Sequence, residues 1–230
     1  MKKLLLFFII FTAIIASSTR AQVTNQRLYD TVGFIPEHYA PRIAKFQSEP
    51  IVTGRIIFLG NSITEIGRWD VLTGDTTVIN RGIGGDITFG VLKRLDDIIV
   101  RQPSKVFLLI GINDIGKDIP DTVIADNISK IVTRIEEGSP STKVYVQSIL
   151  PLNPDVKNFP QHYDKEAHVL RVNAMLPNIL ATTHATFVNI FPLFLDAKQR
   201  LDFSLTLDGL HVNQKGYVIW VAYLKKMGYL

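Results

Sequence analysis

Short, continuous apolar segments alternate along the chain with longer stretches in which apolar residues recur every three or four positions. A short apolar run is typical of a strand buried on both faces of a parallel sheet, whereas the three-four spacing places apolar side chains on one face of a helix. Runs of the first kind predict strands over 55–59, 77–80, 105–110, 143–149 and 186–190. Helical spacing predicts helices over 39–48, 87–99, 123–135, 167–180 and 214–226.

This alternation predicts the fold class. Parallel strands need crossovers of helix length, and strands joined in this way form an α/β fold in which helices cover both faces of the sheet. We therefore expect a three-layer α/β/α sandwich around a parallel sheet of about five strands. No internal repeat or low-complexity tract interrupts it, so we expect one domain over residues 51–230, with residues 22–50 as a lead-in segment that packs on it.

The first 21 residues differ in composition from the rest of the chain. Lys2 and Lys3 precede an apolar run over 4–16, and small residues follow as far as Ala21. A basic start, a short apolar centre and a small-residue exit predict a secretory signal peptide, cleaved after Ala21 or, as a second choice, after Ala16. An uncleaved anchor is the alternative, but a membrane span needs ~20 apolar residues. We expect a secreted or periplasmic protein without stable membrane insertion after cleavage.

Charge and cysteine content narrow the classes of partner. The formal net charge is +4, but the predicted signal peptide carries three basic and no acidic side chains, and its removal leaves 22 basic against 21 acidic ones. A nearly neutral mature chain gives no electrostatic reason to bind nucleic acid or an anionic membrane. The sequence contains no Cys, which argues against a lipid-anchored lipoprotein, disulfides and thiolate chemistry.

Glycine-containing polar loops follow the first three predicted strands. They read Gly60-Asn61-Ser62, Gly82-Ile83-Gly84-Gly85-Asp86 and Gly111-Ile112-Asn113-Asp114. The carboxyl ends of parallel strands meet at one edge of the sheet, where open α/β folds bind ligands, and glycine lets backbone amides approach a ligand closely. Three such loops predict a built site, although a serine directly after a strand is more often a helix N-cap than a nucleophile. The longest loops follow positions 149 and 190, and loops of that length are often functional.

A candidate base occurs near the C-terminus, in Asp208-Gly209-Leu210-His211. Asp and His three residues apart can share one turn, so that the carboxylate holds the imidazole in the tautomer that accepts a proton from Ser62. The other histidines, at positions 38, 162, 168 and 184, have no comparable acidic partner in a glycine-flanked loop. For them a solvated or packed side chain is the better interpretation.

In their order along the chain, these four segments resemble the sequence blocks of the SGNH (GDSL-type) hydrolase family. The resemblance extends over about residues 51–230, and the region 80–95 is most similar to the platelet-activating-factor acetylhydrolase-like branch and to secreted bacterial carbohydrate acetylesterases. It implies a flavodoxin-like sandwich and ester hydrolysis without a metal or organic cofactor.

The resemblance also implies roles for five residues. Ser62 would be the nucleophile, His211 the general base and Asp208 the acid that orients His211. The oxyanion hole would consist of the Ser62 and Gly85 backbone N–H groups and the Asn113 side-chain amide.

Two details of the blocks affect this assignment. We choose Gly85 over Gly84 because the family's glycine directly precedes the Asp of its block, here Asp86. The first block of the family usually reads Gly-Asp-Ser, and Asn61 replaces that Asp. The nucleophile assignment is unaffected, because the replaced Asp is not part of the triad, but Asn cannot brace the serine loop with a charge.

Other chemistries fit the motifs less well. An α/β-hydrolase would need Gly-x-Ser-x-Gly, but position 64 is Thr, and a phosphate-binding loop would need a Lys after its Gly. Asp86, Asp114 and Asp208 lack the His-rich or paired-carboxylate spacing of a metal site.

The leading functional hypothesis is a secreted serine esterase that removes short acyl groups, above all acetyl, from a small-molecule or glycan ester. The alternative among enzymes is a lysophospholipase or thioesterase that acts on longer acyl chains, and the alternative of another class is a non-catalytic flavodoxin-like binding module. The mature chain has no obvious amphipathic membrane helix, which weakens the lipid hypothesis. Arg68, Trp69 and Gln147 are candidate pocket residues, although Trp69 suits core packing equally well and Arg68 suits the surface better.

Overall fold

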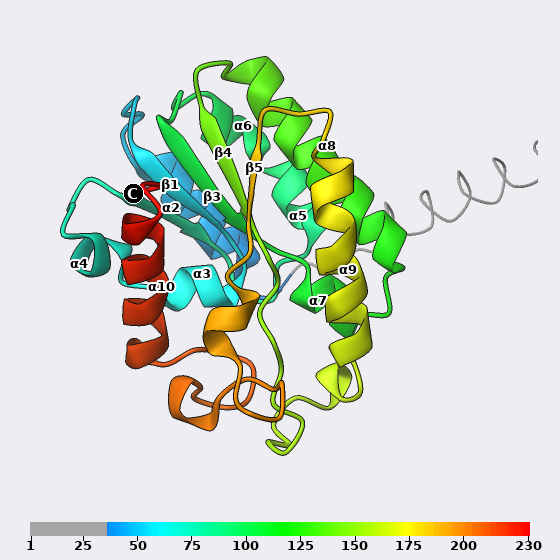
Figure 1. Cartoon of the computed structure of the whole chain (residues 1–230). Helices are drawn as coiled ribbons and strands as arrows, with labels where there is room; N and C mark the ends of the chain where they lie inside the picture. The colour runs from blue at the N-terminus through cyan, green and yellow to red at the C-terminus, as the bar shows by residue number, and fades with distance from the viewer. Residues whose placement is uncertain (1–35) are drawn as a thin grey trace, which may run out of the picture. The chain divides into compact units, whose positions relative to one another are not determined.

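The computed structural model describes residues 36–230, and all statements below concern this part of the chain (Figure 1). The expected signal peptide and the first part of the lead-in segment lie outside the described residues, so the domain boundaries stay predictions. No helix within 36–230 is long and apolar enough to cross a bilayer.

Five parallel strands form one sheet in the order β2-β1-β3-β4-β5. They are β1 (Ile56–Gly60), β2 (Ile79–Gly82), β3 (Lys105–Leu109), β4 (Lys143–Gln147) and β5 (Thr186–Val188). The predicted α/β fold class is confirmed, but β2 begins two residues later than expected. The reason is a turn: the Asp75 carboxylate accepts hydrogen bonds from the backbone N–H and the hydroxyl of Thr77, at 2.8 and 2.6 Å.

Helices cover both faces of this sheet. Figure 1 shows α8 and α9 on one side and α10, α3 and α4 on the other. The helices are α2 (Tyr39–Ser48), α3 (Ser62–Ile66), α4 (Trp69–Thr73), α5 (Thr88–Lys93), α6 (Leu95–Ile99), α7 (Ile112–Gly116), α8 (Asp121–Gly138), α9 (Glu166–Ile179) and α10 (Gln214–Lys226).

An aromatic stack runs across the central strands and under the helices of one face. The Phe107 ring lies between Phe58 and Tyr145, with centroid distances of 4.8 Å on each side, and Trp69 of α4 stacks on Phe58 at 3.8 Å. Trp220 of α10 meets Trp69 edge to face at 5.1 Å. Large buried aromatic rings dominate core energetics, so this stack fixes α4 and α10 against the sheet.

The helix expected over 87–99 is wrong as a single element, because it breaks at Arg94 into α5 and α6. Arg94 leaves the helical conformation and is buried, with its guanidinium beside the ends of two strands. It forms an ion pair with Asp86 at 2.9 Å and donates to the carbonyls of Arg81 and Gly60 at 2.9 and 3.0 Å. A buried guanidinium must be paired, and these three partners outweigh the continuity of one helix.

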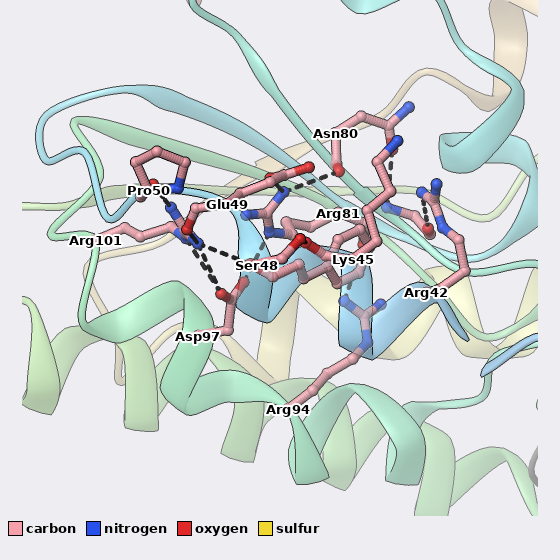
Figure 2. Close-up of polar contacts among 12 residues, drawn as sticks. Arg42, Lys45, Ser48, Glu49, Pro50, Asn80, Arg81, Arg94, Asp97 and Arg101 are labelled. Atoms are coloured by element: carbon pink, nitrogen blue, oxygen red, sulfur yellow. Dashed lines mark hydrogen bonds and ion pairs between the residues drawn. The ribbon is translucent and has the colours of Figure 1, made fainter. Parts of the chain in front are cut away.

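Helix α2, the described part of the lead-in segment, is held by arginines of the strands and of the chain after α6 (Figure 2). Arg101 donates to the backbone carbonyls of Phe46 and Pro50, at 3.1 and 2.6 Å, and so satisfies carbonyls at the C-terminal end of α2. Arg81 pairs with Glu49 at 2.8 Å, and Asp97 neutralises both arginines. The helix is therefore docked by charge-assisted hydrogen bonds in addition to the buried Phe46 ring.

A second buried polar network joins the start of α5 to α7 and α8. The Asp114 carboxylate accepts hydrogen bonds from the Thr88 backbone N–H, at 3.0 Å, and from the Thr88 hydroxyl, at 2.6 Å, while Asn127 donates to that hydroxyl. Complete burial raises the pKa of Asp114 to about 7, against the opposing effect of the Thr88 hydrogen bonds.

This pKa predicts a pH-dependent stability. A carboxyl with a raised folded-state pKa holds its proton more tightly in the folded than in the unfolded chain, so stability falls as pH rises from about 4 to about 7. Between pH 5 and pH 8 we expect the wild type to lose on the order of 2 kcal/mol that Asp114→Asn does not lose. Urea denaturation at both pH values measures the difference. Asp126→Asn, which changes an exposed carboxyl on α8, is the control, and equal losses in all three proteins would contradict the assignment.

Candidate active site

Ser62 is the first residue of α3, two residues after the end of β1 at Gly60. The Asn61 side chain caps this helix, because its Oδ1 accepts the Ile63 backbone N–H at 3.0 Å. Asn61 thus supplies the acceptor that the family's Asp would supply, without the charge. A Cβ at Gly60 would lie 2.2 Å from the Leu109 carbonyl oxygen, so only glycine allows the chain to turn this close to β3.

The structure brings the three predicted triad residues into one line of hydrogen bonds. His211 Nε2 lies 2.9 Å from Ser62 Oγ, and His211 Nδ1 lies 2.8 Å from Asp208 Oδ2. Asp208 and His211 share one turn, as their spacing predicts: Asp208 Oδ1 accepts the backbone N–H groups of Leu210 and His211, at 3.1 and 2.8 Å. The Thr206 hydroxyl closes the turn, because it accepts the Asp208 and Gly209 N–H groups and donates to the His211 carbonyl.

These hydrogen bonds also set the charge of the acid. Partial burial alone would raise the pKa of Asp208, but the backbone and ring hydrogen bonds from His211 outweigh it and lower the pKa below its usual value. Asp208 is therefore a carboxylate at neutral pH. A carboxylate beside Nδ1 keeps the proton on that nitrogen and leaves Nε2 free to accept the Ser62 proton.

One backbone N–H group in the loop after β2 has no acceptor among the described residues. Each of the other backbone N–H groups over 82–88 donates to an acceptor in the protein. Three of these acceptors are side chains outside this segment: Gly82 N–H donates to Asn80 Oδ1, Gly84 N–H to Glu65 Oε2 and Thr88 N–H to the Asp114 carboxylate. Ile83 N–H donates to the Gly60 carbonyl, Asp86 N–H to the Ile83 carbonyl and Ile87 N–H to Asp86 Oδ1. Only the Gly85 N–H remains over 82–88, and the Ser62 N–H is likewise without a described acceptor. Two backbone N–H groups without a described acceptor, in adjacent loops, suit a site that stabilises an anion. Because the Gly84 N–H already donates to Glu65, Gly85 is the better candidate donor of the two glycines.

Asn113 reaches the same loop from α7. Its Nδ2 donates to the carbonyl of Asp86, the residue after Gly85, at 2.9 Å, which fixes the amide plane and leaves one N–H of the group unused. Gly111 makes the approach possible. It has a φ of +125°, and a Cβ there would lie 2.7 Å from Ile149 Cδ1.

The long loop after β4 contributes contacts that sequence reasoning missed. The Phe159 ring meets the His211 ring edge to face at 5.5 Å, and His162 packs against Gly116 of α7. Burial lowers the pKa of His162, so its ring is neutral, and it lines a cavity of about 20 Å³ with Glu166 and Asp208. Figure 1 shows the chain after β4 and after β5 extending beyond the end of the sheet at which α3 and α7 begin. The sequence signal for this region was loop length alone.

The remaining candidates lie elsewhere. Trp69 is in the core and Gln147 is buried against Trp220, whose Nε1 donates to Gln147 Oε1 at 2.6 Å. Arg68 is exposed beside Asp70. Within 36–230 no three His, Asp or Glu side chains converge as a metal site would require.

Comparison with known proteins identifies the family. The model of the GDSL-like lipase/acylhydrolase family matches residues 58–219. Platelet-activating factor acetylhydrolase IB subunit alpha1 of Bos taurus is 28% identical over 171 residues, which cover 70% of this chain and 69% of the relative. An arylesterase of Vibrio mimicus is 34% identical over 149 residues, which cover 64% of this chain and 67% of the relative.

Solved structures share the fold. A solved structure from Streptococcus pneumonia, named as a platelet activating factor, has a TM-score of 0.74 and 28% identity, and the match covers 91% of this chain and 98% of the other. An acetyl xylan esterase, AlAXEase, has a TM-score of 0.64 and 16% identity, over 75% of this chain and 98% of the other. The family match includes Ser62, Gly85, Asn113 and the Asp208–His211 turn, and it spans more than half of the sequence. This chain belongs to the GDSL-like lipase/acylhydrolase family and is an esterase.

Proposed function

We propose that this protein is a secreted serine esterase that hydrolyses short acyl esters, above all acetyl esters of carbohydrates. Ser62 is the nucleophile, His211 the general base and Asp208 the residue that orients His211. The observation that carries the proposal is the line of hydrogen bonds from Asp208 through His211 to Ser62, at 2.8 and 2.9 Å.

The reaction follows from these positions. As Ser62 Oγ attacks the acyl carbon, His211 Nε2 accepts the hydroxyl proton, and the carbonyl oxygen becomes an oxyanion facing the Ser62 and Gly85 N–H groups and the Asn113 amide. Collapse of this intermediate breaks the ester bond, and His211 returns its proton to the leaving alkoxide. Water then attacks the acyl-Ser62 ester with His211 as base. The carboxylic acid is released and free Ser62 is regenerated.

Two observations support a small acyl group on a sugar. Acetyl appears in the names of both the platelet-activating factor acetylhydrolase and the acetyl xylan esterase that this chain resembles. The predicted signal peptide would place the enzyme outside the cytoplasm, where glycan esters are accessible.

One observation favours the longer-chain alternative. An apolar cavity of about 210 Å³ lies between α9 and the loops after β4 and β5, and Leu152 and Glu166 separate it from the small cavity at Asp208. An acyl chain that reached this cavity would make the protein a lysophospholipase or thioesterase.

Chain-length preference separates the two hypotheses. We expect the protein to hydrolyse p-nitrophenyl acetate, to lose activity through butyrate to octanoate, and to lose all activity in Ser62→Ala. Ser48→Ala, which changes an exposed serine at the end of α2, is the matched control and should behave as wild type. A preference for octanoate would favour the longer-chain hypothesis, and equal rates in wild type and Ser62→Ala would contradict serine catalysis.

Covalent labelling tests the non-catalytic alternative. A serine-directed fluorophosphonate should label the wild type at Ser62, because only an activated serine attacks this probe, and should not label Ser62→Ala. Peptide mass spectrometry locates the label. A folded wild type that remains unlabelled would point to a binding module.

The oxyanion hole makes a separate prediction. Asn113→Ala should lower kcat by on the order of 10²–10³ with little change in KM, because the lost donor acts mainly on the transition state. Steady-state kinetics on p-nitrophenyl acetate measures both constants, with Asn178→Ala, on the exposed face of α9, as the control. An unchanged kcat in Asn113→Ala would remove this residue from the oxyanion hole.

A further inference from the structure

We propose that Glu65 is a positioning residue for the oxyanion hole, and that helix α2 holds it in place. This inference rests on the proposed function, since it concerns the Gly85 N–H as an oxyanion donor. Glu65 lies on α3, three residues after Ser62, and its Oε2 accepts the Gly84 backbone N–H at 2.5 Å. A hydrogen bond from a backbone amide to a carboxylate is charge-assisted and stronger than one between neutral groups.

The loop geometry explains why this hydrogen bond matters. Residues 83–86 form a β-turn closed by the Asp86 N–H and the Ile83 carbonyl, at 3.1 Å. Gly84 and Gly85 occupy its two central positions, and Gly85 has a φ of +76°, which is the value of the third residue in a type II turn.

The Gly85 N–H belongs to the central peptide of this turn. A flip of that peptide converts type II into type I and reverses the direction of the N–H, and glycine at both central positions removes the steric barrier that would favour one type. The turn therefore needs an external contact to keep the Gly85 N–H in its present direction. Glu65 supplies that contact at the adjacent Gly84 amide.

Arg42 of α2 and His38, the N-cap residue of α2, contact this carboxylate. Arg42 Nε lies 3.2 Å from Glu65 Oε1, and its Nη2 donates to the Gly82 carbonyl at 2.7 Å, so one guanidinium binds both the carboxylate and the start of the loop. His38 Nε2 lies 3.4 Å from Glu65 Oε2. A Cβ on Gly84 would lie 2.9 Å from His38 Nε2, so the imidazole closes the space beside the turn.

The anchoring of α2 by Arg81 and Arg101 makes this support rigid (Figure 2). Asn80 provides a second, independent link between the loop and the nucleophile helix. Its Nδ2 donates to the carbonyls of Thr64, Glu65 and Gly67, and its Oδ1 accepts the Gly82 N–H. Loss of Glu65 therefore releases the turn at Gly84 without separating α3 from the loop.

The test is a set of variants at Glu65, assayed on p-nitrophenyl acetate. Glu65→Ala should lower kcat by about 10- to 100-fold, less than the removal of a donor, with KM within about threefold of wild type. The rate of fluorophosphonate labelling at Ser62 should fall in parallel, because its transition state uses the same hole. Glu65→Gln keeps an acceptor for the Gly84 N–H and should remain within about fivefold of the wild-type kcat.

Glu136→Ala is the matched control. Glu136 of α8 also accepts a backbone N–H in a loop, that of His184 at 2.9 Å, but no contact joins it to the turn, so the variant should keep the wild-type kcat even where its melting temperature falls. Loss of activity in Glu136→Ala equal to that in Glu65→Ala would reduce the role of Glu65 to general stability and overturn the proposal.

Arg42→Met tests the contribution of α2 and does not require Glu65→Ala to fold. It should lower kcat by less than Glu65→Ala, and the loss in the double variant should be smaller than the product of the two single losses, because each single variant already removes the Arg42–Glu65 ion pair. Additive losses would contradict this. A wild-type kcat in both Glu65→Ala and Arg42→Met, with Ser62→Ala inactive, would overturn the inference alone, whereas an active Ser62→Ala would overturn the proposed function.

Discussion

The arrangement of this site depends on the hydrogen bonds of the Arg94 guanidinium. It donates to the carbonyl of Gly60 at the end of β1, to the carbonyl of Arg81 in β2 and to the Asp86 carboxylate. Arg94 and these three partners are all buried. A buried cation is stable only when acceptors in the protein bind its N–H groups. The hydrogen bonds to Arg94 therefore constrain the positions of the two strand ends and of the loop after β2. Ser62 follows the first of these partners and Gly85 precedes the last. The positions of the proposed nucleophile and the proposed oxyanion donor are thus linked through one buried guanidinium.

Around this pair, the loop after β2 satisfies its polar groups almost completely. Each N–H over 82–88 has a protein acceptor except that of Gly85, and the exceptions to such pairing in folded proteins need an explanation. An oxyanion supplies one, because a donor that already points at the place where charge develops needs no reorganisation during the reaction. In the proposed mechanism, the pairing of the other amides leaves the loop only one N–H donor for the oxyanion.

The sequence predicts the five strands and the four segments of the candidate site because both depend on local patterns. Buried strands such as 105–109 read as apolar runs, and the spacing of Asp208 and His211 alone suffices to place them on one turn. The break at Arg94 is not predictable in this way, since hydrophobic periodicity records which positions are buried and says nothing of how a buried arginine is paired. The contact of Phe159 with His211 joins segments about fifty residues apart, and no periodicity encodes it.

Helix α2 lies outside the sequence blocks shared by the family but contacts the candidate site. The family match begins at residue 58, and α2 ends at Ser48, yet Arg42 and His38 contact Glu65, whose carboxylate accepts the Gly84 N–H of the loop after β2. A chain reduced to residues 51–230 would retain every residue of the four blocks and lose two of the three groups around the Glu65 carboxylate. The Gly84–Gly85 turn would then depend on a carboxylate exposed to water, which competes for the same hydrogen bonds. The structure that orients the catalytic groups of the proposed mechanism therefore includes residues outside the shared sequence blocks.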